Sequence, residues 1–169
     1  MNIRQLVMIV FATILSSSVF AARDVAVVTD SLYKEECSAC HMAYQPGLLP
    51  ARSWEKMMAN LADHFGENAE LGEKERKAIT DYAMKNAADF SNFKRSVKIM
   101  RSLSASDVPL RITDTPYIKR KHHELSNRHV KDNPKVKSLS RCDACHTKAD
   151  TGSYSEREIK VPGFGRWED

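Results

Sequence analysis

Two pentapeptides, Cys37-Ser38-Ala39-Cys40-His41 and Cys142-Asp143-Ala144-Cys145-His146, decide how this chain of 169 residues is organised. Both are C-x-x-C-H, the attachment signal for c-type haem. Two thiols at this spacing can each form a thioether with one vinyl group of the same porphyrin, and the histidine that follows lies under the iron as its proximal ligand. The sequence therefore predicts two covalently bound haem c groups. The predicted attachment residues are Cys37, Cys40, Cys142 and Cys145, and the predicted iron ligands are His41 and His146.

Other uses of the cysteines fit the sequence less well. The chain has 4 cysteines, and the two motifs contain all of them. A thioredoxin-like dithiol needs a βαβ pattern nearby, and the sequence shows none. A zinc site made of all four cysteines would have to join two distant pairs, and it gives the two trailing histidines no role.

Residues 1–21 have the pattern of a secretory signal peptide that is cleaved off. Arg4 supplies the positive charge, an apolar run extends from Leu6 to Leu15, and the segment Ser16-Ser17-Ser18-Val19-Phe20-Ala21 ends in a small residue. We expect cleavage after Ala21, with Ala22 as the alternative site. The apolar run is short for a membrane span, so the mature protein is not expected to cross the membrane. Because c-type haem is attached after export, the expected compartment is the bacterial periplasm.

The N-terminal half has the apolar spacing of three helices. The first is expected over residues 30–40 and the third over residues 72–86. The second is expected to begin near Ser53 and to end at Gly66, with five apolar residues on one buried stripe. These are Trp54, Met57, Met58, Leu61 and Phe65. Since the strand signal is poor, we predict a mainly α fold.

His64 lies on the same stripe, three residues after Leu61. An imidazole on a buried face needs a partner, and the sixth coordination position of the first haem iron would supply one. The alternative is a histidine near a helix C-terminus that interacts with the helix dipole. Met57, Met58 and Met84 are rival ligands, since Met is the usual sixth ligand in single-haem cytochromes c. The spacing of Met57 and Met58 favours core packing.

Three histidines remain as candidates for the sixth ligand of the second haem: His122, His123 and His129. His122 and His123 are adjacent, and adjacent helical residues point about 100° apart, so at most one of them can face a haem. We expect the other two of the three to be surface residues.

Charge is distributed unevenly along the chain. Residues 22–93 have 8 Lys and Arg against 12 Asp and Glu, residues 94–148 have 14 against 5, and residues 149–169 have 3 against 5. The positive pole therefore surrounds the second motif, where we expect an acidic partner to dock. The alternative is a solvated basic face without a partner. Nucleic-acid binding is not expected, because the compartment argues against it.

Several further segments resemble the dihaem cytochrome c family of soluble bacterial electron carriers. The first motif is followed by Tyr44, Leu48-Leu49-Pro50, Ser53-Trp54 and His64-Phe65-Gly66. Later segments are Arg111-Ile112-Thr113-Asp114-Thr115-Pro116, Lys121-His122-x-Glu124, the second motif with Thr147, Gly152 and Val161-Pro162. The resemblance covers essentially the whole mature chain.

The resemblance implies that both haems have two histidine ligands. The sixth ligand would be His64 for the first haem, called haem 1, and His122 for the second, called haem 2. His123 stands where the family often has Arg, so a local swap to His123 stays open. The implied fold is a class I cytochrome c-like helical domain over residues 22–93 with haem 1, followed by a largely irregular haem-binding segment over residues 94–169 with haem 2.

Two six-coordinate irons leave no open position for a substrate, so we expect an electron carrier and no catalytic residues. The alternative is a dihaem peroxidase or a gas-binding sensor, either of which needs one open haem site. The resemblance implies that the partners are other redox proteins, either an oxygen-binding monohaem cytochrome or a membrane b-type cytochrome.

Overall fold

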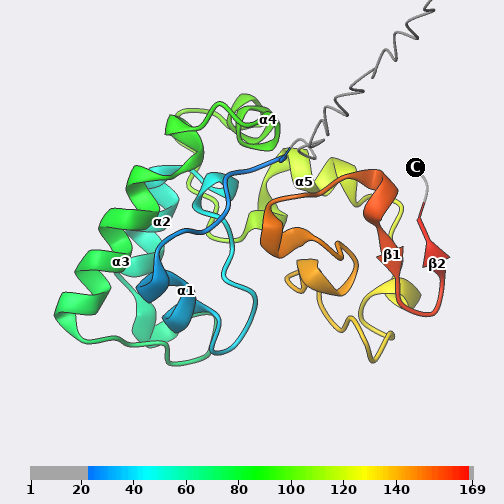
Figure 1. Cartoon of the computed structure of the whole chain (residues 1–169), viewed down its shortest axis with the longest axis horizontal. Coiled ribbons are helices and arrows are strands. Elements are labelled where there is room, and N and C mark those ends of the chain that lie inside the picture. The colour runs from blue at the N-terminus through cyan, green and yellow to red at the C-terminus, as the bar shows by residue number, and fades with distance from the viewer. Residues whose placement is uncertain (1–22, 168–169) are drawn as a thin grey trace, which may run out of the picture.

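Short helices joined by long loops, with very little sheet, make up residues 23–167, which are the part of the chain that this computed structural model describes (Figure 1). The helices are α1 (Ser31–Cys37), α2 (Ala51–Met58), α3 (Glu73–Lys85), α4 (Lys94–Ser102) and α5 (Pro116–Lys121). Single turns of 3₁₀ helix interrupt the loops. The predicted mainly α fold is confirmed. The predicted signal peptide, residues 1–21, lies outside the described residues.

One hydrophobic core holds α1, α2 and α3 together at one end of the molecule (Figure 1). Tyr33 on α1 is 1% exposed, and its ring meets that of Trp54 on α2 edge-on at 6.3 Å. Ile79 and Ala83 on α3 are also buried in this core. Asp30 caps α1, because its Oδ1 accepts a hydrogen bond from the Tyr33 amide at 2.8 Å.

The predicted boundaries of the three N-terminal helices were partly correct. The third was predicted over residues 72–86 and is observed one residue shorter at each end. The first ends at Cys37, because the rest of the haem motif forms a turn. The second was predicted to continue to Gly66, which is wrong, since it ends at Met58. The chain then folds back, and the Ala69 amide donates to the Leu61 carbonyl at 2.9 Å.

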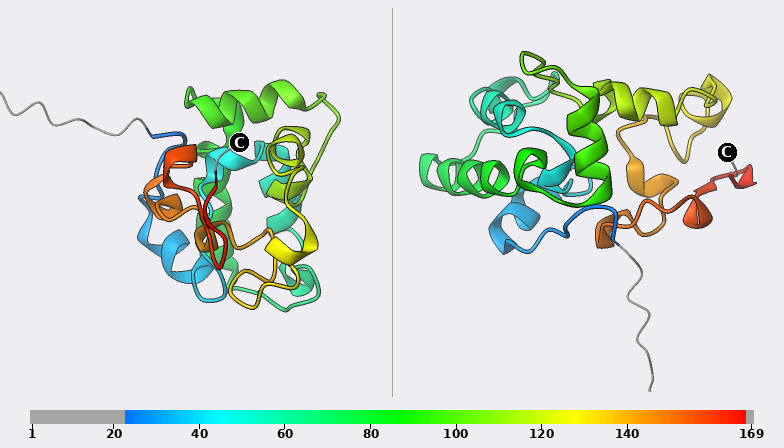
Figure 2. Two further views of the ribbon diagram at one scale, coloured as in Figure 1. Left: turned by 90° about the vertical axis from the view of Figure 1, so that its right-hand side faces the viewer. Right: turned by 90° about the horizontal axis from the view of Figure 1, so that it is seen from above.

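The second half contains α4, α5, loops and a short hairpin whose two strands have two residues each. The strands β1 (Lys160–Val161) and β2 (Gly165–Arg166) pair antiparallel. Figure 2 shows α4 running across one side of the molecule. Among residues 23–167, none of the helices has the length and apolar composition needed to cross a membrane.

A second core joins residues from both halves of the chain. Ile99 on α4 and Tyr117 on α5 pack with Leu48 and with Val25, which precedes α1. The loop before α2 is also buried from Gln45 to Pro50, and the Trp54 indole donates to the Pro46 carbonyl at 2.8 Å. This loop therefore lies between the two ends of the molecule. The predicted boundary between residues 93 and 94 stays a prediction.

The segment before α1 is attached to the C-terminal half. The amides of Asp24 and Val25 both donate to the Gly152 carbonyl, at 2.9 and 3.2 Å. Gly152 has a φ of 78°, which favours glycine, and a Cβ built on it would lie 2.4 Å from the Val25 carbonyl oxygen. The segment around Val25 can therefore approach the segment around Gly152 this closely only because glycine has no side chain.

Replacement of Gly152 by Ala should lower the free energy of unfolding by about 2–3 kcal/mol, because the left-handed backbone is strained and the Val25 carbonyl has to move. The matched control is Gly163→Ala. Gly163 has a φ of 83° but no atom within 4 Å of a built Cβ, so only the backbone cost of about 1 kcal/mol applies. Guanidinium unfolding of the haem-loaded protein measures both. Equal losses for the two variants would contradict the close packing of Gly152 against Val25.

Candidate haem sites

The first motif places His41 directly after the turn that follows α1. Its ring Nδ1 lies 2.8 Å from the Met42 carbonyl oxygen. Since a carbonyl can only accept, Nδ1 carries the proton and the lone pair is on Nε2, which is the arrangement of a metal-binding imidazole. The ring of Tyr44 stacks on that of His41, with centroids 4.6 Å apart and planes inclined by 20°. The motif histidine is therefore held in one orientation.

A tight turn, not a helix, places His64. The amide of His64 donates to the Glu67 carbonyl at 2.8 Å, and the Glu67 amide donates back at 3.3 Å. Phe65 and Gly66 have φ of 61° and 98°, the pattern of a type I′ turn. Positive φ is rare for a bulky residue such as Phe65, and its side chain is 42% exposed, so the predicted buried stripe ends before it.

The turn brings His64 opposite His41. Their ring centroids are 6.2 Å apart and their planes are inclined by 24°. Two metal–nitrogen bonds of about 2 Å each, together with the offset of each nitrogen from its ring centre, give a separation of about 6 Å. The spacing therefore fits one iron between the two rings.

The three methionines that were considered as rival ligands belong to the first hydrophobic core. Met58 is buried in the core of α1, α2 and α3, and Met57 and Met84 pack against that core.

Both burial and neighbouring charges keep His64 neutral. Its pKa is lowered first by desolvation and then by His41 and Arg111. The guanidinium of Arg111 lies 3.8 Å from the centre of the Phe65 ring, so a residue of the second half covers the turn. Only a neutral imidazole can bind a metal ion, so these shifts favour ligation.

The second motif places His146 opposite His122, with ring centroids 6.0 Å apart and planes inclined by 70°. His122 is the residue that ends α5, and its Nδ1 lies 2.9 Å from the Ile118 carbonyl oxygen, which again leaves Nε2 with the lone pair. The neighbouring His123 is directed to solvent, with 70% of its side chain exposed. The structure therefore brings His122, and not His123, to His146.

A cavity surrounds this second pair. Its wall includes Cys142, Cys145, His122 and His146 together with a larger set of apolar side chains. Those include Leu48, Ile112, Tyr117, Leu125, Val136, Ile159 and Val161. An apolar wall with a few converging metal-binding groups suits a flat porphyrin.

His146 itself is shielded from water. Its pKa is lowered to about 4, first by burial and then by electrostatic interaction with His122 and with the Arg95 guanidinium, while Asp24 opposes the shift. Its Nδ1 is buried without a hydrogen-bond partner among the described residues. A buried polar atom without a partner is unfavourable unless another group compensates, so the site fits a bound prosthetic group.

The thiols of both motifs differ from those of a redox-active dithiol. Burial raises the pKa of Cys37 to about 11 and that of Cys142 to about 11. Reactive dithiols have lowered pKa values because neighbouring charges stabilise the thiolate. These cysteines lie against apolar surroundings, which agrees with a place beneath a porphyrin edge.

One histidine differs from its prediction. His129 was expected on the surface, which is wrong, since it is only 4% exposed. Its ring meets those of Phe164 and Trp167 edge-on at 4.5 and 5.1 Å, and its Nδ1 accepts from the Ser126 amide at 3.0 Å. The C-terminal hairpin folds over His129, and no local pattern in the sequence indicates this contact.

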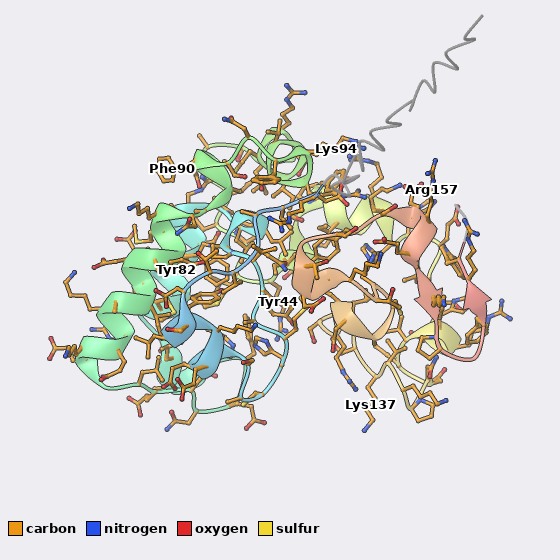
Figure 3. The ribbon with its side chains drawn as sticks, in the orientation of Figure 1. Tyr44, Tyr82, Phe90, Lys94, Lys137 and Arg157 are labelled. Atoms are coloured by element: carbon orange, nitrogen blue, oxygen red, sulfur yellow. The ribbon has the colours of Figure 1, made fainter. Side chains whose placement is uncertain are left out.

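Three residues that join the two sites were not predicted as functional. Figure 3 shows Tyr44 in the middle of the molecule, and its hydroxyl donates to the Ser140 carbonyl, two residues before Cys142. The hydroxyl of Tyr154 donates to Gln45 at 2.7 Å, and its ring lies 5.2 Å from that of His146. Tyr44 was noted only as part of the family resemblance. Gln45 and Tyr154 carry no signal, because the contact joins residues separated by 109 positions.

The helical fold and the two motifs, each with a second imidazole opposite, define a c-type cytochrome with two haems. The family model described as dihaem cytochrome c matches residues 33–154. The chain therefore belongs to the dihaem cytochrome c family, as the resemblance implied, and has two covalently bound haem c groups.

Solved structures of the same family are similar to this chain. A diheme cytochrome c from Rhodobacter sphaeroides is 50% identical, with a TM-score of 0.69, over 77% of this chain and 100% of that one. A diheme cytochrome type c from Shewanella baltica OS155 is 38% identical, with a TM-score of 0.67, over 82% and 97% of the two chains. No curated protein matches the chain.

Replacement of His122 by Ala should open the ferrous haem 2 to carbon monoxide, because the residue opposite His146 is removed. The matched control, His123→Ala, should not bind carbon monoxide, because the His123 ring that it removes is directed to solvent. Optical titration of the reduced holoproteins measures both. If only His123→Ala binds carbon monoxide, the sixth ligand of haem 2 is His123 and not His122.

Proposed function

We propose that this protein is a periplasmic electron carrier in which each haem is held between two histidines, His41 and His64 for haem 1 and His146 and His122 for haem 2. The observation that supports this most directly is the spacing of the two ring pairs, 6.2 and 6.0 Å. A bound haem supplies an iron that accepts or releases one electron.

The protein's own residues then have two tasks. Hydrogen bonds to the backbone orient His41 and His122. Burial lowers the pKa of His64 and His146, which favours the neutral form of those two rings. Two opposed imidazoles also leave no place for peroxide or a gas at the iron. A peroxidase or sensor would need one of these rings to move away.

Electron paramagnetic resonance of the oxidised protein tests this proposal. Two low-spin signals are expected, and they should differ, because the angle between the ring planes is 24° at one site and 70° at the other. Haem 1 should give the more rhombic signal and haem 2 the more axial one. A stable high-spin component would contradict the proposed electron carrier. A test for peroxide turnover would then distinguish an enzyme from a gas-binding sensor.

Replacement of His64 by Met should raise the reduction potential of haem 1 and leave that of haem 2 nearly unchanged, because histidine–methionine ligation favours the ferrous state. Spectroelectrochemical titration measures both potentials. The control is Met84→Leu, which conserves volume in the core and should change neither potential. If Met84→Leu alters a potential and His64→Met does not, a methionine is the ligand.

The basic surface around haem 2 supports the proposal that an acidic redox protein docks there. Ion pairs join Lys119 to Asp114, Lys121 to Glu156 and Lys148 to Glu158, and so reduce the net charge near those lysines. Lys135, Lys137 and Arg141 are exposed, and Figure 3 shows Lys137 reaching outward from the haem 2 end. They lie close in sequence to Leu139, which is 40% exposed and lines the haem 2 cavity.

We expect electron transfer from reduced flavodoxin, an acidic donor, to slow as ionic strength rises, since salt screens the attraction that speeds encounter. The double variant Lys135→Glu with Lys137→Glu should be slower still at low salt and equal to the wild type at high salt. The control reverses Lys74 and Lys77 on α3, far from this surface, and should have little effect. Stopped-flow kinetics measures the rates. A rate that does not depend on salt would contradict docking at this surface.

A further inference from the structure

A buried ion pair lies beside the haem 2 site and has no part in ligation. Nε of Arg95 is 3.3 Å from Oδ1 of Asp24, and the two side chains are only 13% and 11% exposed. In contrast, the pair of Lys77 and Asp81 on α3 is 73% and 64% exposed. Burial makes a charge interact more strongly with its surroundings, because little water screens it.

Arg95 is held at the wall of the haem 2 cavity. Its guanidinium donates to the Tyr117 hydroxyl and, at 2.8 Å, to the Tyr154 carbonyl. Tyr154 in turn lies with its ring 5.2 Å from that of His146. A guanidinium stays protonated in proteins, so a permanent positive charge is fixed next to the haem 2 site.

Asp24 is fixed just as firmly but is not among the residues that line the cavity. Its Oδ2 accepts from the Tyr154 amide at 2.8 Å, and its carbonyl accepts from the Arg95 amide at 3.0 Å. Its own amide donates to Gly152 at 2.9 Å. The carboxylate is therefore the counter-charge of the guanidinium, and it lies outside the wall of the cavity.

We propose that the buried pair of Asp24 and Arg95 sets the reduction potential of haem 2, with Arg95 raising the potential and Asp24 limiting that rise. The inference rests on the proposed ligation of haem 2 by His122 and His146. Reduction from ferric to ferrous makes the haem more negative by one unit of charge, whatever its propionates contribute. A nearby cation therefore favours the ferrous form, and a nearby anion favours the ferric form.

The pair also connects the segment before α1 to the residues beside the haem 2 site. Asp24 follows the predicted cleavage site by three residues, yet its partners Arg95, Gly152 and Tyr154 all belong to the second half of the chain. The segment before α1 therefore supplies one of the two charges beside the haem 2 site.

Potentiometric titration of the holoprotein tests the proposal with charge-removing variants. Asp24→Asn keeps an acceptor for the Tyr154 amide and leaves Arg95 without its counter-charge, so haem 2 should become easier to reduce. A tenfold change in the reduction equilibrium is expected, which is about 59 mV for one electron. Arg95→Gln should shift haem 2 in the opposite direction. The double variant should lie near the wild type.

An effect of charge shifts the haem 2 potential in opposite directions in Asp24→Asn and Arg95→Gln. A site that is merely loosened would shift it in the same direction in both variants. Asp81→Asn, in the exposed pair on α3, is the matched control and should change neither haem. The potential of haem 1 is the internal control. If Arg95→Gln does not fold, Arg95→Lys keeps the charge and should stay closer to the wild type than Asp24→Asn does.

The proposal is overturned if Asp24→Asn leaves the haem 2 potential unchanged or lowers it while the low-spin signals persist. Shifts of the same sign in Asp24→Asn and Arg95→Gln would also overturn it. The absence of a low-spin haem 2 signal from the wild-type protein would instead contradict the proposed ligation, so the two failures can be told apart.

Discussion

The facing pair of imidazoles at each site is the constraint on which the rest of this structure depends. The rings are 6.2 Å apart in one pair and 6.0 Å apart in the other, although the two pairs are built differently. A type I′ turn with a strained Phe65 presents His64, whereas the end of α5 presents His122. Backbone carbonyls orient His41 and His122 in the same way, through Nδ1. Local geometry therefore differs while both pairs keep a spacing that fits a single metal ion.

The two sites are joined through side chains that do not bind a haem. The loop that follows the first motif is buried between the two ends of the molecule, where Tyr44 and Gln45 contact the second half through Ser140 and Tyr154. The segment before α1 adds hydrogen bonds to Gly152. The buried apolar residues form two separate clusters, so polar contacts of this kind also contribute to how the halves meet.

The charges near haem 2 differ in how far they are exposed to water, which the net charge of each part of the chain does not show. Residues 22–93 are acidic and residues 94–148 are basic, yet three lysines near haem 2 are paired with carboxylates. Screening by water limits what those exposed pairs contribute. The buried pair of Asp24 and Arg95 is different, because it lies at the haem 2 site with little water around it. Surface charge is therefore proposed to guide a partner, and buried charge to set the potential of the iron.

The sequence by itself determined the number of haems, their attachment motifs and the third helix, because each depends on residues that are close together in the chain. It also indicated His64 and His122, through the spacing and the family resemblance, but it placed His64 on a helix that in fact ends at Met58. Only the tertiary structure decided that His122 and not His123 faces His146, that His129 is buried under the C-terminal hairpin, and that Asp24 reaches Arg95. These contacts join segments far apart in the sequence, and helical periodicity describes only which face of an element is apolar, not which distant segment covers it.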